Sequence, residues 1–287
     1  LYRNLGRLYL SQERYHDAAR TYHGYVERSP LADDAPSLQV AVANAFAAGG
    51  FTDRVLEAKV EFVERFGFDG EWLAVRGGSA PEEVRDYLRS ALGELARHYH
   101  AVAQASELPA DYAVAAEWYR RRLDGFPEDP EAAEFAFLLA EALDDGGRTL
   151  EAAVAYEYMA SVYAEDSRAP EAGYAAVLAY RTVADADGQE FSKLAAIDAG
   201  LRFADAFPGH EHAVAVRADA AEALFAAGDL IRAADQAGLL AAGKHRDLLV
   251  PFLRVEQEGR QDAPQPGGFP RRFDHNQFHV PLCLLPV

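Results

Sequence analysis

A short segment recurs along most of the chain and constrains the fold more than any other feature. Its first copy, Tyr15–Tyr22, reads YHDAARTY. Related copies are Tyr112–Tyr119, Thr149–Tyr156, Lys193–Gly200 and Leu230–Ala237, with a degenerate copy that begins at Phe51. The starts of successive copies are 37 residues apart from 112 to 149 and from 193 to 230. The distances from 51 to 112 and from 149 to 193 are longer, which indicates insertions there. Repetition at this period predicts stacked structural units, because one such unit cannot bury its own apolar face.

Each unit has the composition of two helices joined by a tight turn. Turn-forming pairs end the first helix, and a second helix follows at once. These pairs are Ser11-Gln12, Gly49-Gly50, Gly146-Gly147 and Gly228-Asp229. Several second helices then stop at a proline, which blocks helix continuation and disfavours helix in the residue before it. The prolines are Pro30, Pro127 and Pro208.

Small and aromatic side chains occupy fixed places in the second helix. The small residue is Ala18, Ala115, Ala152, Ala196 or Ala233. One helical turn later, Tyr22, Tyr119 and Tyr156 are placed to fill the space beside it, whereas Gly200 and Ala237 stand there in the last two copies. We therefore expect Ala18, Ala115 and Ala152 to be almost fully buried where the paired helices meet.

The first unit carries the fullest form of the pattern, Tyr2-x2-Leu5-Gly6-x2-Tyr9, followed by Ala18-x3-Tyr22 and Pro30. It resembles the tetratricopeptide repeat (TPR), with tyrosine in place of the usual leading tryptophan. The resemblance covers about residues 1–243 and departs at Gly200 and Ala237. Together with the stacking argument it implies an all-α fold, a right-handed α-α superhelix of about six helical hairpins with a concave groove.

A change of composition near residue 262 marks a second region. Residues 1–243 carry a net charge of −19, whereas residues 244–287 sum to +1 and are rich in proline and glycine. We expect a solenoid over 1–243, followed by a short helix and an irregular tail over 244–287. The first helix begins without a capping residue, which favours a solenoid truncated at its N-terminus. The tail is interpreted as a linker, a strap docked on the chain itself or non-native sequence.

Charge and cysteine content exclude several classes of function. The chain has 28 Lys and Arg against 46 Asp and Glu, a net charge of −18. We expect no nucleic-acid partner, because phosphate binding needs a basic face. No apolar run approaches the roughly 18 residues of a transmembrane helix. Cys283 is the single cysteine, which rules out an internal disulfide framework and a cysteine-cluster metal site.

The sequence offers no catalytic motif. His98 and His100 are two residues apart, which places their side chains on different faces of a helix. Paired carboxylates such as Asp144-Asp145 flank predicted turns, where acidic side chains cap free N–H groups. Phosphate-binding loops, dinucleotide-binding fingerprints and nucleophile elbows are missing from the sequence. We therefore predict no enzymatic activity, no catalytic residue, no cofactor and no metal site.

The expected groove supplies the candidate binding residues, which the repeat places on the open face of the first helices. They are Arg3, Arg7, Gln39, Arg97, His100, Gln104, Phe137, Glu141 and Glu222, with Ala43, Phe46 and Phe225 beside them. The N-terminal half of this set is basic or amide-bearing, and the C-terminal half is acidic with aromatic side chains. A protein or peptide partner is therefore predicted, and an open end of the array would also allow self-association.

Three functions are compatible with these features. The first is a non-catalytic interaction scaffold that binds a peptide or a partner helix in the groove. The second is a bacterial cell-envelope assembly or division-coordination factor, because Phe126–Ala133 resembles the repeats of periplasmic TPR lipoproteins. The third is a regulatory domain of a larger enzyme. The second resemblance favours a periplasmic or envelope location, with the cytoplasm as the alternative.

Overall fold

The computed structural model describes residues 1–242, which form helices and, within that range, no strand. Consecutive helices pair as six hairpins in this part of the chain. The pairs are α1 (Tyr2–Ser11) with α2 (Tyr15–Arg28), α3 (Ala35–Ala48) with α4 (Thr52–Phe66), α6 (Glu82–Ser106) with α7 (Pro109–Gly125), α8 (Ala132–Asp145) with α9 (Thr149–Val162), α10 (Ala169–Asp187) with α11 (Glu190–Ala206), and α12 (Ala213–Ala226) with α13 (Leu230–Ala242). The short helix α5 (Glu71–Ala74) lies between the second and third hairpins. The expected all-α array of about six hairpins is confirmed.

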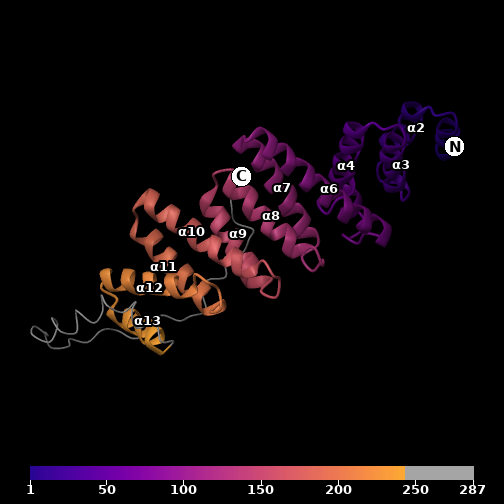
Figure 1. Cartoon of the computed structure of the whole chain (residues 1–287). Coiled ribbons are helices and arrows are strands. Elements are labelled where there is room, and N and C mark those ends of the chain that lie inside the picture. The colour runs from indigo at the N-terminus through magenta and orange to yellow at the C-terminus, as the bar shows by residue number, and fades with distance from the viewer. Residues whose placement is uncertain (243–287) are drawn as a thin grey trace, which may run out of the picture.

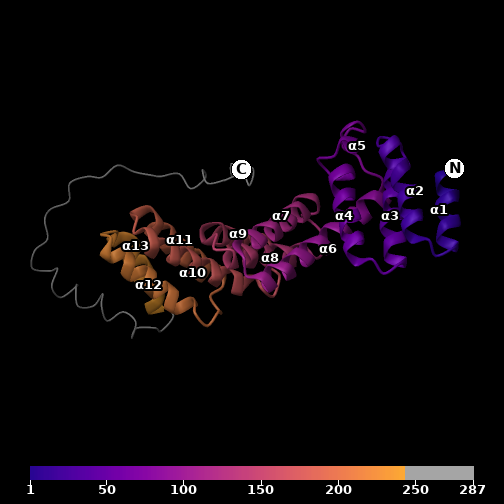
Figure 2. The same cartoon turned by 90° about the horizontal axis from the view of Figure 1, so that it is seen from above.

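The hairpins stack in chain order, because each long helix packs mainly against its neighbours in the sequence. Figures 1 and 2 show an elongated array with α1 and α13 at opposite ends. Ion pairs also join corresponding helices of successive hairpins. Arg181 of α10 lies 3.0 Å from Asp219 of α12, and Arg120 of α7 lies 3.0 Å from Glu151 of α9. First helices therefore contact first helices, and second helices contact second helices.

Extra helical turns explain the long steps in the sequence repeat. Helix α6 has 25 residues and α10 has 19, whereas the first helices α3, α8 and α12 each have 14. The insertion before the third hairpin also contains α5, whose Trp72 is buried and donates its indole N–H to the carbonyl of Ala32 at 2.8 Å. The insertions are thus ordered parts of the array.

The alanine positions behave as the repeat predicts. Ala18, Ala115 and Ala152 are each 0% exposed. The tyrosine after the first alanine packs tightly on the preceding helix: a Cβ added at Gly6 would lie 2.2 Å from Cε1 of Tyr22. Glycine is therefore the residue that allows α1 and α2 to approach this closely.

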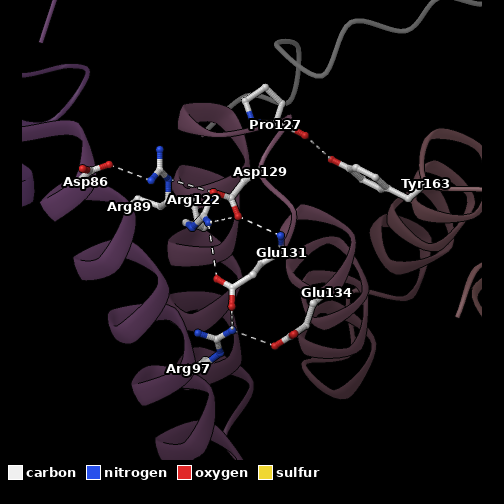
Figure 3. A network of polar contacts seen from close by, with 9 residues as sticks. All are labelled: Asp86, Arg89, Arg97, Arg122, Pro127, Asp129, Glu131, Glu134 and Tyr163. Atoms are coloured by element: carbon white, nitrogen blue, oxygen red, sulfur yellow. Dashed lines mark hydrogen bonds and ion pairs between the residues drawn. The ribbon is translucent and has the colours of Figure 1, made fainter. Parts of the chain in front are cut away.

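An ionic corner joins the third and fourth hairpins (Figure 3). Arg122 of α7 is fully buried, and its Nη2 lies 2.9 Å from Oδ1 of Asp129, in the turn before α8. A second guanidinium, that of Arg89 in α6, lies 3.0 Å from the same carboxylate. Burial alone would raise the pKa of Asp129, but the N–H of Glu131 and the two guanidinium groups hold that pKa below its usual value. The corner is therefore a structural ion cluster, in which buried guanidinium nitrogens of Arg122 and Arg89 are held by charge and make no hydrogen bond among the described residues.

None of the helices described is both long and apolar enough to cross a membrane. The short helix and irregular tail expected over 244–287, and the three interpretations of that tail, lie outside the described residues. At the other end, Leu5 is 38% exposed, and Tyr2 and Tyr9 are half-buried, so the leading face of α1 is partly exposed.

Candidate interaction site

The predicted groove residues differ widely in exposure. Arg7, Arg97, Gln104 and Glu222 are exposed; Arg3, Phe137 and Glu141 are half-buried; Gln39 and His100 are buried. Within the chain, Arg3 pairs with Asp34 at 3.5 Å, and Arg97 pairs with Glu134 at 3.0 Å. The set therefore does not form one open surface, and only part of it is available to a partner.

Gln39 corrects the prediction for the second hairpin. Its side chain is 0% exposed and lies between α3 and α4. The amide Nε2 donates to the carbonyl of Ala58 at 3.2 Å and to Oε2 of Glu61 at 2.8 Å. Gln39 therefore joins the two helices of its hairpin and presents no surface to a peptide.

Three carboxylates gather at the C-terminal end of α8, and we call them the carboxylate cluster: Glu141, Asp144 and Asp145. Within residues 1–242 none of them makes a side-chain hydrogen bond or an ion pair. The C-terminal end of a helix carries the negative end of its dipole, so acidic side chains are unfavourable there. Burial and then the charge of Asp145 raise the pKa of both Glu141 and Asp144 above their usual values, although Arg168 partly offsets this for Glu141.

These carboxylates differ from other acidic residues that end or precede helices. Asp187, at the end of α10, accepts a hydrogen bond from the N–H of Gln189 at 2.8 Å and another from Ser192 at 2.6 Å. Its pKa is lowered by these bonds, as expected for a capping residue. The carboxylate cluster has no such partners in the described chain, so the prediction that Asp144-Asp145 caps a helix is wrong.

His100 lies on α6 beside the carboxylate cluster. It is only 4% exposed, and its Nδ1 lies 2.9 Å from the hydroxyl of Tyr119. The other ring nitrogen, Nε2, is buried and has no hydrogen-bond partner among the described residues. Burial lowers the pKa of His100 below its usual 6.5, and Asp145 opposes that shift through its charge. Because Asp145 acts on both His100 and the other two carboxylates, the histidine and the cluster belong to one electrostatic neighbourhood.

Aromatic side chains border this neighbourhood. The ring of Phe137, one turn before Glu141 on α8, lies 5.9 Å from that of Tyr156. Tyr112 lies 6.1 Å from His100, and its pKa is raised by burial and then by Asp145 and Glu107. The predicted residues that the structure brings together are therefore His100, Phe137 and Glu141, joined by two carboxylates that the sequence assigned to capping.

A second group of acidic residues and a histidine lies at the second helices. Suitable ligand atoms of His23, Glu27 and Glu61 lie within 4.8 Å of one another in the described range. Arg65, however, lies 3.0 Å from Glu61 and also pairs with Glu27. The guanidinium already occupies the space between the carboxylates, so we interpret this group as an ion-pair cluster. The expected absence of a metal site stays a prediction.

Comparisons with known proteins find similarity to solved structures only. No family model matches the chain, and no curated protein matches it. Among solved structures it is similar to a single-residue variant of a Podosopora anserina protein described as a kinesin light chain with nearly identical TPR-like repeats, at 16% identity and a TM-score of 0.31, covering 88% of this chain and 95% of that one. It is also similar to the P58(IPK) TPR domain, at 15% identity and a TM-score of 0.23, covering 90% and 92%.

Both of these structures are described as TPR or TPR-like repeats. The description of this chain as stacked helical hairpins rests on its own helix order and packing.

Proposed function

We propose that this chain is a non-catalytic interaction scaffold that binds a positively charged segment of a partner protein at the carboxylate cluster. Stacked hairpins build extended surfaces that suit this role. Each hairpin packs only on its neighbours, so its remaining surface is open to solvent and to a partner. The observation that carries the proposal is the grouping of Glu141, Asp144 and Asp145 without a side-chain partner in residues 1–242.

A cationic side chain would relieve the unfavourable electrostatics of the cluster. The raised pKa values of Glu141 and Asp144 mean that their ionised forms are disfavoured where they lie. A lysine or arginine of a partner supplies the missing opposite charge and several N–H donors. The net charge of −18 would also accelerate the approach of a basic segment.

Binding of short charged peptides tests this proposal. The probe is fluorescein-labelled pentalysine, measured by fluorescence anisotropy, with labelled pentaglutamate as the charge control. We expect Asp144→Asn with Asp145→Asn to weaken pentalysine binding about tenfold or more, the equivalent of losing about 1.4 kcal/mol.

A matched variant separates a site from general attraction. Glu82→Gln with Glu83→Gln removes the same charge from an exposed pair in the first turn of α6. It should change pentalysine affinity less than about twofold, because exposed distant charges are screened by salt. Equal losses in the two double variants would overturn the proposed site.

A further inference from the structure

A cleft of about 490 Å³ opens between the first and second helices of the fifth hairpin and the first helix of the sixth. Its walls come from α10, α11 and α12, and their uncharged part consists of alanines together with Ile197 and Gly200 of α11. A volume of this size lies within the range of natural ligand pockets, about 300–1,000 Å³.

The cleft lies beside Gly200, which stands where the first, third and fourth hairpins have a tyrosine. In the third hairpin, the ring of Tyr119 lies 5.5 Å from His100 on its own first helix and 6.0 Å from Phe135 on the next first helix. Gly200 occupies the position of Tyr119 in the fifth copy of the repeat. A Cβ added there would lie 3.1 Å from Val216 of α12, so α11 and α12 are close at this point. Gly200 lines the cleft and sends no side chain into it.

The rim of the cleft is charged and mainly acidic. Arg181 and Asp219, which lie 3.0 Å apart, neutralise each other across α10 and α12. Asp185, Glu190 and Lys193 also line the cleft, and none of the three makes a side-chain hydrogen bond or ion pair in the described part of the chain. The rim therefore carries one more negative charge than positive charge, and its two free carboxylates match a basic ligand.

We infer that this cleft is an anchor pocket for an aromatic side chain of a partner segment whose neighbouring residues are basic. The inference rests on the proposed function, because α8 and α10 are first helices of consecutive hairpins and one basic segment would use both. The aromatic ring takes the place of the absent repeat tyrosine, and Asp185 and Glu190 receive the adjacent lysines or arginines. Buried aromatic anchors commonly carry most of the affinity of such contacts.

The two isoleucines of the chain provide an internal probe and control. Ile197 lines the cleft, whereas Ile231 is 78% exposed on α13. Protein labelled at the isoleucine δ1 methyl groups is titrated with the peptide KKFKK, with KKAKK and EEFEE as controls. The aromatic ring of KKFKK should shift the Ile197 methyl signal and leave that of Ile231 in place, and KKFKK should bind about tenfold more tightly than KKAKK.

A cleft-filling variant completes the test on the full chain. Ala223→Leu adds side-chain volume to the α12 wall of the cleft, whereas Ala215→Leu adds the same volume to an exposed place on that helix. Circular dichroism checks that both remain helical. Ala223→Leu should remove the tenfold preference for KKFKK over KKAKK, and Ala215→Leu should keep it.

The outcomes separate this inference from the proposed function. If KKFKK binds but the Ile197 methyl does not move, or if KKAKK moves it equally, the anchor pocket is wrong while the basic-segment scaffold stands. If EEFEE binds as tightly as KKFKK, the charge assignment of the rim is overturned. If neither lysine peptide binds, both proposals fail.

Discussion

The first four hairpins and the last two follow the same helical pattern but differ in how their cores are filled. One continuous cluster of buried residues runs from Ala18 to Ala176. Beyond it the core divides into two small clusters, one around Phe203 and Val216 and one around Leu201 and Leu224. The division falls in the fifth hairpin, where Gly200 stands in place of the repeat tyrosine.

This difference coincides with one position of the second helix, which is a tyrosine in the first, third and fourth hairpins. Tyr22, Tyr119 and Tyr156 are all at least nine-tenths buried, and the ring of Tyr119 lies against residues of both α6 and α8. Glycine at the same place preserves the helix pairing and lines a cleft, and the buried residues around it fall into smaller groups. The same position therefore fills the core of one hairpin and lines a cleft in another.

The largest expected effect comes from making the third hairpin like the fifth. Tyr119→Gly removes a fully buried ring and introduces glycine within a helix, so we expect a loss of about 4 kcal/mol in the free energy of unfolding. Urea denaturation followed by circular dichroism measures it. Tyr119→Phe is the control and should cost about 1 kcal/mol, because it loses only the hydrogen bond to His100. A loss below about 1 kcal/mol for Tyr119→Gly would show that the buried tyrosine does not account for the stability of the third hairpin.

The corners between hairpins also differ between the two regions. Arg122 and Asp129 form a buried ion pair after the third hairpin, whereas Phe203 and His210, 5.1 Å apart, occupy the corresponding places after the fifth. Arg122→Met should lower the free energy of unfolding by about 3 kcal/mol, since it leaves a buried carboxylate short of a partner. Arg121→Met is the comparison, because Arg121 is partly exposed and pairs with Glu64; it should cost less than about 1 kcal/mol. Equal costs would show that burial of Arg122 is unimportant.

Overpacking the alanine positions sharpens the comparison further. Ala152 is 0% exposed in the filled core, whereas Ala196 is 8% exposed and lines the cleft. Ala152→Leu should cost about 2 kcal/mol, because no space exists for the added methyl groups. Ala196→Leu should cost less than about 0.5 kcal/mol, because the cleft accepts them. Thermal or urea unfolding of the two variants measures these losses of stability. Similar losses for Ala152→Leu and Ala196→Leu would mean that the cleft is closed in solution.

The smallest expected effect is on the pH dependence of stability. The pKa values of Glu141 and Asp144 are raised in the folded chain, so the folded state holds their protons more tightly than the unfolded state. Wild type should therefore be less stable at pH 7 than a variant with Glu141→Gln and Asp144→Asn. The deficit should shrink as the pH falls through the raised pKa values. Urea midpoints at several pH values test this, and a deficit that grows on acidification would reverse the assigned sign.

Most of the fold could be predicted from the sequence because the hairpin pattern is local and repeated. Ala18, Ala115 and Ala152 are identified by their spacing from turn pairs and prolines, and each is 0% exposed. The groove residues are harder to predict from the sequence, because an error of one position rotates a side chain by about 100° around the helix. Gln39 is such an error: it was expected in the groove, but its side chain is hydrogen-bonded to α4 within its own hairpin.

Two features of the candidate site required information that is distant in the sequence. Asp144-Asp145 has the composition of a capping pair, and only the structure shows that no N–H group or cation meets these side chains within the described chain. His100 is hydrogen-bonded to Tyr119, and Asp145 acts on its pKa; both residues belong to other helices. The absent tyrosine at Gly200 was visible in the repeat alignment, but its consequence, a cleft, depends on α12 and was not predicted.

Native-state hydrogen exchange tests most directly whether the missing tyrosine divides the array. We predict that amides of α2–α4 and α6–α9 exchange only through the largest unfolding event, whereas those of α11–α13 exchange through a smaller opening at lower denaturant. Both ends of an ordinary repeat array fray, so the asymmetry between the two ends is the informative quantity. Protection that falls equally from both ends, or that is uniform along residues 1–242, would contradict the account.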